Sequence, residues 1–253
     1  MSGRSIVAAG VATAIGVAAL VGLGVWQLKR LAWKEALIAA VETRAHAPAV
    51  EVPPPSDWGA LKPDDYEYRH VRVAGQFDLG RQALVFRALG DPHGRFGGPG
   101  YLVLTPLKLP SGEFVLVNRG FVPADSKAAA ANGPVGPVEI TGLLRSTEGR
   151  TWFTPADDPA KGVWYTRDVE EMASAMGLES HAPFSIDADA GADPLALPEG
   201  GETILSFPNN HLSYAFTWFG MAVALVAVFL AWAFTRGREP AERHDPEGLA
   251  PGA

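Results

Sequence analysis

Two long apolar runs lie near the ends of the chain. Residues 6–25 form twenty consecutive positions without a charge, and residues 214–234 form a second run of twenty-one. At about 1.5 Å per helical residue, either run is long enough to cross the roughly 30 Å hydrocarbon core of a bilayer. A helix also satisfies its own backbone hydrogen bonds, as a lipid environment requires. The pattern therefore predicts two transmembrane helices, one near each end of the chain.

The first run also resembles the core of a signal peptide, with Arg4 as a charged start. It is long for such a core, however, and Trp26-Gln27-Leu28-Lys29-Arg30 follows it in place of a small-residue cleavage site. We therefore expect an uncleaved anchor at residues 6–25, preceded by a cytoplasmic N-terminus at residues 1–5. Little chain precedes the run that could hold an Arg-rich mitochondrial presequence, which favours a bacterial inner membrane.

Charges around the second run indicate the topology. Arginines follow it at positions 236, 238 and 243, and residues 204–234 contain no Lys or Arg. The positive-inside rule then places both termini in the cytoplasm and the region between the spans in the periplasm. Three cations that follow the first span would lie outside, against this rule, and need another role: Lys29, Arg30 and Lys34.

The region between the spans has the pattern of a β-rich domain. Apolar and polar side chains alternate over residues 68–77, which predicts a strand. Residues 101–109 and 113–118 flank Pro110-Ser111-Gly112, which predicts a hairpin. Both hairpin strands are apolar on both faces, so we expect them at the centre of the sheet. Further strands are predicted at residues 83–87, 137–144, 163–166 and 183–188.

One helix is expected within this domain. Asp168 and Glu171 have the spacing of a capping box, and Gly177 ends the apolar stripe that follows them. The stripe consists of Val169, Met172, Ala173 and Met176. The predicted fold class is therefore a membrane protein with two transmembrane helices flanking a β-rich α+β extracytoplasmic domain.

The remaining segments follow from helix formers and helix breakers. Residues 28–45 contain no Gly or Pro, so the first helix should continue to about residue 45. Pro48 and Pro53-Pro54-Pro55 then predict an extended, Pro-rich linker over residues 46–64. The other expected segments are the β-rich periplasmic domain at residues 65–205, a return to the membrane at 206–213, the second span at 214–234 and a disordered cytoplasmic tail at 235–253.

Composition excludes several kinds of function. The chain has no cysteine, which excludes disulfides, thiolate metal sites and CxxC redox motifs. Residues 35–213 carry 14 Lys and Arg against 24 Asp and Glu, so nucleic acid is not an expected partner. None of the common nucleophile, phosphate-binding or zinc-protease motifs is present, and we do not expect an enzyme. The glycine-rich residues 90–100 lack the lysine of a phosphate loop and are interpreted as a mobile surface loop.

Two short clusters at the outer edges of the predicted spans are candidates for function. In the first, Trp26, Arg30 and Trp33 or Lys34 fall on one helical face. Tryptophans and long cations are ordinary anchors at the membrane surface, where they interact with lipid. Anchoring alone therefore explains this cluster.

The second cluster precedes and opens the second span. Asn209 or Asn210 can cap the helix, and His211, Tyr214 and Trp218 share a face at i, i+3 and i+7. A cap followed by an aromatic belt explains these residues. A neutral imidazole is also a ligand for haem iron, and flanking rings can stack on a porphyrin. The cations of the first cluster could then pair with the haem propionates. The residues alone leave both interpretations open.

Several ordered segments resemble the Surfeit-locus cytochrome c oxidase assembly factors, the Surf-one or Shy-one family. Each segment alone is moderately specific, but their order along residues 24–220, between two spans that the family also has, is highly specific. The loop at 90–100 and the tail have no matching piece. The matching segments are Gly24-Val25-Trp26-Gln27-Leu28-Lys29-Arg30-Leu31-Ala32-Trp33-Lys34, Tyr68-Arg69-His70-Val71-Arg72-Val73-Ala74-Gly75-Gln76-Phe77, Gly100-Tyr101 with Thr105-Pro106-Leu107, Val115-Leu116-Val117-Asn118-Arg119-Gly120-Phe121-Val122-Pro123 and Asn209-Asn210-His211-Leu212-Ser213-Tyr214-Ala215-Phe216-Thr217-Trp218-Phe219-Gly220.

The resemblance implies a two-span inner-membrane chaperone of the respiratory chain that helps to mature the haem-copper oxidase (complex IV). It implies assistance with haem a insertion into oxidase subunit I, and haem a synthase is a further candidate partner. Bacterial members are regarded as haem a binders, and their proposed ligand histidine corresponds to His211. The runner-up is a scaffold that stabilises newly inserted subunit I without binding haem. The candidate haem-binding residues are His211, Tyr214, Trp218, Trp26, Arg30 and Lys34.

Overall fold

The computed structural model describes residues 3–203 and 209–237. The chain divides into two compact units, a central unit of residues 39–206 and a helical unit formed by the segments on either side of it. Two apolar helices flank a sheet-rich α+β domain, which confirms the predicted architecture. The predicted extracytoplasmic placement of the domain stays a prediction.

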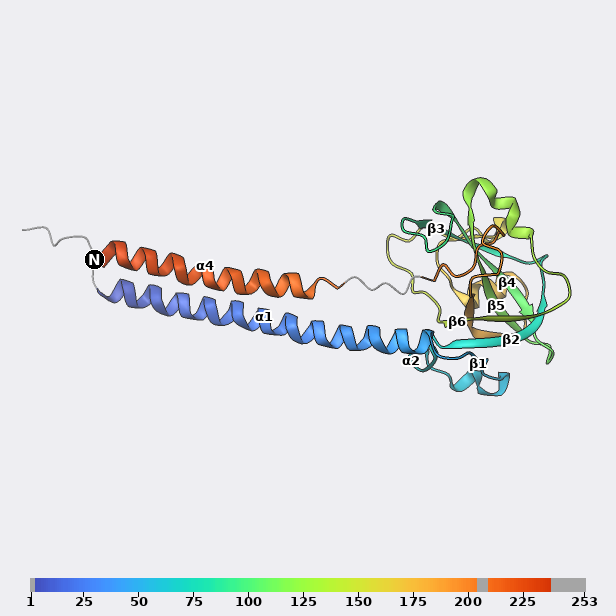
Figure 1. Cartoon of the computed structure of the whole chain (residues 1–253), viewed down its shortest axis with the longest axis horizontal. Helices are drawn as coiled ribbons and strands as arrows, with labels where there is room; N and C mark the ends of the chain where they lie inside the picture. Colours follow the sequence, from blue (N-terminus) through green and yellow to red (C-terminus); the bar gives the residue numbers. More distant parts are fainter. Residues whose placement is uncertain (1–2, 204–208, 238–253) are drawn as a thin grey trace, which may run out of the picture. The chain divides into compact units, whose positions relative to one another are not determined.

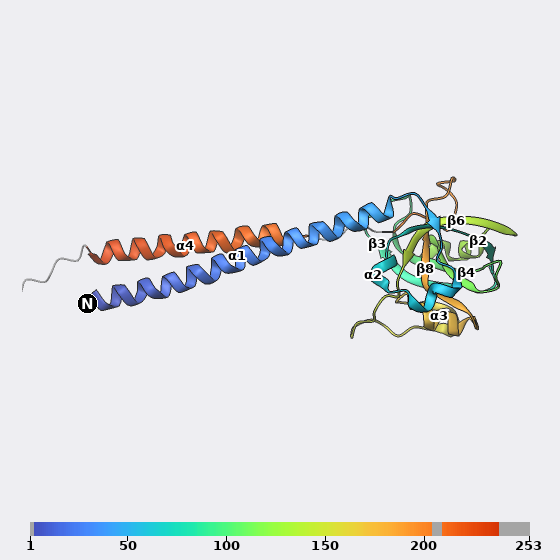
Figure 2. The same cartoon turned by 90° about the horizontal axis from the view of Figure 1, so that it is seen from below.

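The helical unit consists of α1 (Gly3–Ala45) and α4 (His211–Gly237), which run side by side in opposite directions (Figures 1 and 2). The most apolar stretches of the two helices have mean hydropathies of 2.3 and 2.0, and both helices are long enough to cross a membrane. The first helix ends at Ala45, as the sequence predicts. Helix α4 continues through residues 235–237 of the predicted tail, and residues 238–253 lie outside the described chain.

The contact between α1 and α4 uses a stripe of positions spaced alternately three and four residues apart, which is the spacing of left-handed helix packing. A Cβ added at Gly24 would lie 2.6 Å from the Phe219 ring, so glycine allows close approach at this point. The stripe contains Gly10, Thr13, Val17, Leu20, Gly24 and Gln27 on α1, and His211, Ala215, Trp218, Ala222, Leu225, Phe229 and Trp232 on α4.

The central unit is built on one eight-stranded sheet with the order β1-β2-β6-β8-β5-β4-β3-β7. Because β2 also pairs with β4, the strands β2, β6, β8, β5 and β4 close into a ring. The strands are β1 (Val50–Glu51), β2 (His70–Phe77), β3 (Ala83–Leu89), β4 (Gly98–Lys108), β5 (Phe114–Pro123), β6 (Pro137–Arg145), β7 (Val163–Trp164) and β8 (His181–Ala188).

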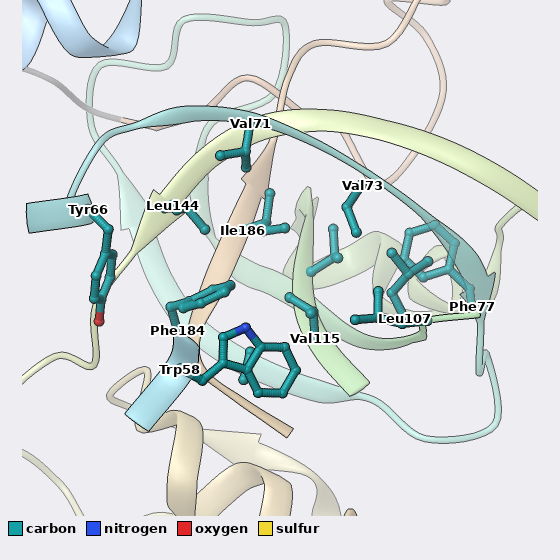
Figure 3. Packing of buried hydrophobic residues seen from close by; sticks show 13 residues of the cluster. Trp58, Tyr66, Val71, Val73, Phe77, Leu107, Val115, Leu144, Phe184 and Ile186 are labelled. Atoms are coloured by element: carbon teal, nitrogen blue, oxygen red, sulfur yellow. The ribbon is translucent and has the colours of Figure 1, made fainter. Parts of the chain in front are cut away.

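All five strands of the ring contribute side chains to the main hydrophobic core (Figure 3). A second core lies between the sheet and α3 (Val169–Ala175), on the side where β3 and β7 extend the sheet. The hairpin strands β4 and β5 contribute to both cores. This explains why they are apolar on both faces and confirms their predicted central position.

The predicted helix and hairpin of the domain are confirmed. The Asp168 carboxylate accepts a hydrogen bond from the Glu171 amide at 3.0 Å, and α3 is followed by Gly177 with a φ of 67°. Gly112, in the turn of the hairpin, has a φ of 108°. The pattern does not predict the 3-10 helices η2 (Ala124–Ala131) and η3 (Pro159–Lys161).

The extended linker predicted at residues 46–64 is wrong. This segment carries β1, the 3-10 helix η1 (Pro55–Ala60) and the start of α2 (Pro63–Tyr66). Trp58 is buried, lies edge-on to Phe184 at 6.0 Å between ring centroids, and donates to the Pro53 carbonyl at 2.8 Å. Prolines at the first positions of η1 and α2 begin these short helices, because proline needs no amide partner there.

The glycine-rich loop between β3 and β4 is held by two buried carboxylates. Four consecutive backbone amides, from residue 93 to residue 96, donate in pairs to Glu202 and Glu199. A run of amides of this kind is a natural anion site, and here the anions come from the chain itself. The residues that follow β8 are irregular up to residue 203, and residues 204–208, which include part of the predicted return segment, lie outside the described chain.

Candidate functional site

His211 is the first residue of α4 and lies at the end of its apolar stretch. The Asn209 side-chain oxygen accepts from the His211 amide at 3.4 Å, and the Asn210 carbonyl accepts from the Tyr214 amide at 3.1 Å. The first turn of α4 therefore has partners for two of its amides, and the predicted cap is confirmed for the Asn209 side chain, whereas Asn210 contributes its backbone carbonyl. The cap fixes the place where the imidazole leaves the helix.

The imidazole of His211 contacts α1 through Gln27. The Nδ1 atom lies 2.7 Å from the Gln27 amide oxygen, and Gln27 is only 9% exposed. A neutral imidazole that donates from Nδ1 carries its lone pair on Nε2. No hydrogen bond reaches Nε2 within residues 3–203 and 209–237. The histidines that bind metals are oriented in the same way, by a hydrogen bond from the nitrogen that faces away from the metal.

This arrangement would suit a protein ligand to haem iron. Nε2 is the nitrogen that would ligate, and the Gln27 bond would hold the ring in the ligating tautomer. A cluster of three or more His, Asp or Glu side chains that could hold a free metal ion is absent from the described residues. Within the part of the chain that the structure describes, what this site offers to a metal is therefore one imidazole nitrogen.

The other predicted residues of α1 lie on an exposed face. Trp26 and Trp33 are 55% and 53% exposed, and the Arg30 guanidinium carbon lies 4.1 Å from the centroid of the Trp33 ring. These residues lie at i, i+4 and i+7, one position along from the packing stripe that holds Gln27. Among the described side chains, no hydrogen bond or ring contact joins them to His211. Lys34 is half-buried.

The two predicted aromatic residues of α4 separate. Trp218 lies on the packing stripe with His211, whereas Tyr214 is 56% exposed. Trp218 lies seven residues after His211, about two helical turns, and therefore stays on the same stripe. Tyr214 lies three residues after His211, less than one turn, and therefore lies at the edge of the stripe. The structure thus places His211 at the contact with α1, leaves Trp218 half-buried on the same helical stripe and leaves Tyr214 exposed.

Gln27 is the residue that sequence reasoning missed. It lies between residues of the first cluster. Its polar side chain becomes informative only when the opposite helix is known, because that helix supplies its partner, His211. One signal was available in the sequence. A glutamine at a buried stripe position of an apolar helix needs a partner, and such positions are expensive in a membrane unless they have a function.

The central unit contains a second polar centre, around Asp187 of β8. Asp187 is 4% exposed, and its carboxylate lies 2.8 Å from Arg167 and 3.0 Å from Arg145. It also accepts from Asn118 at 3.0 Å and Thr203 at 2.9 Å. Burial alone would raise the pKa of Asp187, but the two arginines and the two donors hold this pKa below its usual range. Both oxygens of the Asp187 carboxylate therefore take part in contacts that hold the fold together. The sequence pattern did not indicate this centre.

Comparison with known proteins identifies the family. The SURF1 family matches residues 14–223, a range that includes Gln27 and His211. The chain belongs to the SURF1 family. The sequence resemblance to the Surfeit-locus assembly factors is therefore confirmed.

Individual SURF1 relatives cover most of the chain. It is 38% identical to Surfeit locus protein 1 of Homo sapiens over 217 residues, which is 80% of this chain and 70% of the relative. Surfeit locus protein 1 of Rattus norvegicus is 36% identical over 216 residues, with 80% and 68% covered. A SURF1-like protein of Monosiga brevicollis is 36% identical over 230 residues, with 85% and 82% covered.

Proposed function

We propose that this SURF1 protein is a cytochrome c oxidase biogenesis factor that assists haem a insertion into oxidase subunit I, and that it binds haem a transiently at His211. One observation carries the haem part of the proposal. The Gln27 amide fixes the His211 ring at 2.7 Å and leaves Nε2 without a partner among the described residues. Membership of the SURF1 family supports the oxidase part.

In this proposal haem a is cargo, and each residue handles a different part of it. His211 would ligate the iron through Nε2, and the Trp218 and Trp26 rings offer apolar surface for the macrocycle. Arg30 and Lys34 would pair with the propionates, since a carboxylate forms its strongest hydrogen bonds with cations. One histidine would hold the cargo less firmly than two ligands, which favours onward transfer.

We further propose a bacterial inner-membrane location with both termini in the cytoplasm and the β-rich domain in the periplasm. The arginines at and after the end of α4, beginning with Arg236, support this orientation. The cations Lys29, Arg30 and Lys34 would then lie on the outer side, where a haem delivered by haem a synthase needs counter-charges. Lipid around α1 and α4 completes the set of proposed partners.

A His211→Ala replacement in the chromosomal gene tests the haem proposal. Oxidase isolated from this strain should contain less haem a than wild type, with its copper content unchanged, at an equal level of the SURF1 protein. His46→Ala is the matched control, because His46 is exposed and, among the described residues, its ring bonds to the Glu42 carbonyl at the end of α1. Normal haem content in the His211→Ala strain would contradict the proposal.

The alternative function is a scaffold that stabilises newly inserted subunit I without binding haem. The same 2.7 Å bond supports it, because a hydrogen bond between Gln27 and His211 would also hold α1 against α4. A scaffold needs the two helices paired but needs no open nitrogen. Gln27→Glu with His211→Lys keeps a polar pair between the helices, and would restore oxidase maturation if the scaffold function is the true one.

A further inference from the structure

Arg119 of β5 is buried in a way that sets it apart from the other buried arginines. It is 9% exposed, and its guanidinium donates to Thr105 Oγ1 at 2.8 Å, to the Ala130 carbonyl at 2.5 Å and to the Asn132 carbonyl. All three acceptors are neutral. No carboxylate of the described residues forms an ion pair with Arg119.

The arginines of the Asp187 centre show the usual arrangement. Arg145 and Arg167 both pair with carboxylates, at distances between 2.8 and 3.2 Å. Burying a charge costs several kcal/mol unless it is paired, which is why such pairing is the rule. Burial lowers the pKa of Arg119 to about 10, so the guanidinium still carries its charge at neutral pH. Its charge therefore lacks a counter-ion within the described chain.

The guanidinium lies at the wall of an open cavity of about 620 Å³. This volume falls in the range of roughly 300–1,000 Å³ that is usual for sites of small organic ligands. The Phe77 ring, whose centroid lies 5.6 Å from the guanidinium carbon, forms part of the wall, and Figure 3 shows this ring at one edge of the main core. Other apolar side chains of the wall include Ile140, Leu195, Leu197 and Pro198.

We propose that this cavity binds an organic monocarboxylate with an apolar body, of the medium-chain fatty acid class, and that Arg119 pairs with its head group. A guanidinium has five N–H donors, and the three contacts leave two for a ligand. A carboxylate would accept charge-assisted hydrogen bonds from them and supply the missing counter-charge. The apolar walls suit an alkyl chain and are unsuited to an inorganic anion. This site is independent of the haem proposal.

Titration of the full-length protein in lipid nanodiscs with sodium octanoate tests the proposal. Calorimetry, corrected with empty nanodiscs, should show saturable binding of one octanoate per chain. Octanol, which has the same chain without the charge, should show no saturable heat. Inorganic phosphate should not compete, because it lacks the apolar body.

Two matched variants locate the site. Leu195→Asp puts a carboxylate on the wall of the cavity, at a side chain that is 59% exposed and so tolerates substitution. It should weaken octanoate binding by about tenfold or more. Phe153→Asp makes the same change of charge at a side chain that is 70% exposed and is not part of the cavity wall, and should leave binding unchanged.

Arg119→Gln should abolish binding, and if this variant fails to fold then Leu195→Asp decides. The proposal is overturned if octanoate shows no saturable binding, if octanol binds as tightly as octanoate, if phosphate competes on equal terms, or if Leu195→Asp binds like the wild type.

Discussion

The helical unit and the central unit differ in how many buried polar groups they contain and in how these groups are connected. Between α1 and α4, the packing stripes consist mostly of small and apolar residues, and among the described side chains a hydrogen bond between Gln27 and His211 joins the two helices. In the central unit, buried charges are numerous and linked, with Asp187 alone engaging four partners.

The difference indicates what each polar group is for. The partners of Asp187 come from β5, β6 and the segments around residues 167 and 203, so this centre joins elements that are distant in the sequence. It is a means of specifying the fold. The pair between the helices is isolated in an apolar setting, where packing alone can hold helices together. A polar pair in such a place is a functional candidate by default.

Breaking the Asp187 centre should have the largest effect. Asp187→Asn removes the carboxylate that Arg145 and Arg167 share and leaves each arginine with a single carboxylate partner. Loss of one partner of a buried pair costs about 3–5 kcal/mol. We expect a drop of this size in the free energy of unfolding of the central unit, measured by denaturant titration with tryptophan fluorescence. Asp158→Asn is the control, because Asp158 pairs with the 78% exposed Lys161 and should change stability little. An equal effect of the two variants would contradict a special role for the centre.

The burial of Trp58 makes a prediction about the domain boundary. A fragment of residues 46–203 should fold, whereas a fragment of residues 64–203 lacks β1 and Trp58 and should be destabilised by about 3 kcal/mol or more. Circular dichroism of the longer fragment should show a strand-rich spectrum and cooperative unfolding. Equal stability of the two fragments would mean that the Trp58 contact with Phe184 contributes little.

The contact between the helices can be loosened at Gly24, away from the Gln27–His211 pair. Gly24→Ala places a methyl group 2.6 Å from the Phe219 ring, and overpacking of this kind costs about 1–3 kcal/mol. Gly22→Ala is the control, because its added Cβ meets nothing within 4 Å.

The chain has no cysteine, so Gln27→Cys with His211→Cys can be bridged by a short thiol reagent. Bridging should fall with Gly24→Ala only, and an equal fall with Gly22→Ala would refute the glycine contact.

The smallest expected effect is a pH dependence from His70. Its Nε2 lies 2.9 Å from Asp189 and its Nδ1 lies 2.9 Å from the Ala47 carbonyl. Burial lowers the pKa of His70, but these two acceptors together raise it above its usual value. A raised pKa means that the stabilisation is fully present below about pH 6.5 and is lost as the pH rises through the folded-state pKa.

The measurement for His70 is the free energy of unfolding between pH 5.5 and 8.5. The wild type should lose stability toward the upper end of this range, and His70→Gln should lose less, because its side chain does not titrate. The same slope in both proteins would show that His70 does not contribute to the pH dependence.

Most elements of the fold could be predicted from the sequence, because apolar periodicity sets them locally. The closure of the ring could not, since the pairing of β2 with β4 depends on strands more than twenty residues apart. The prolines around Trp58 predict a linker, whereas its place in the core depends on contacts with distant residues such as Phe184. His211 could be identified from its cap and its imidazole, whereas Gln27 gains its meaning from the opposite helix.

An absorption spectrum of the purified full-length protein supplied with haem a tests the central claim most directly. The wild type should carry haem a with the spectrum of a histidine-ligated iron. His211→Ala should lose most of this signal at equal protein concentration, and Gln27→Leu should retain it with an affinity reduced by about 10–100-fold, as expected when the partner that orients a ligand is removed. A haem spectrum that is the same in His211→Ala as in the wild type would contradict the assignment of His211 as the ligand and favour the scaffold.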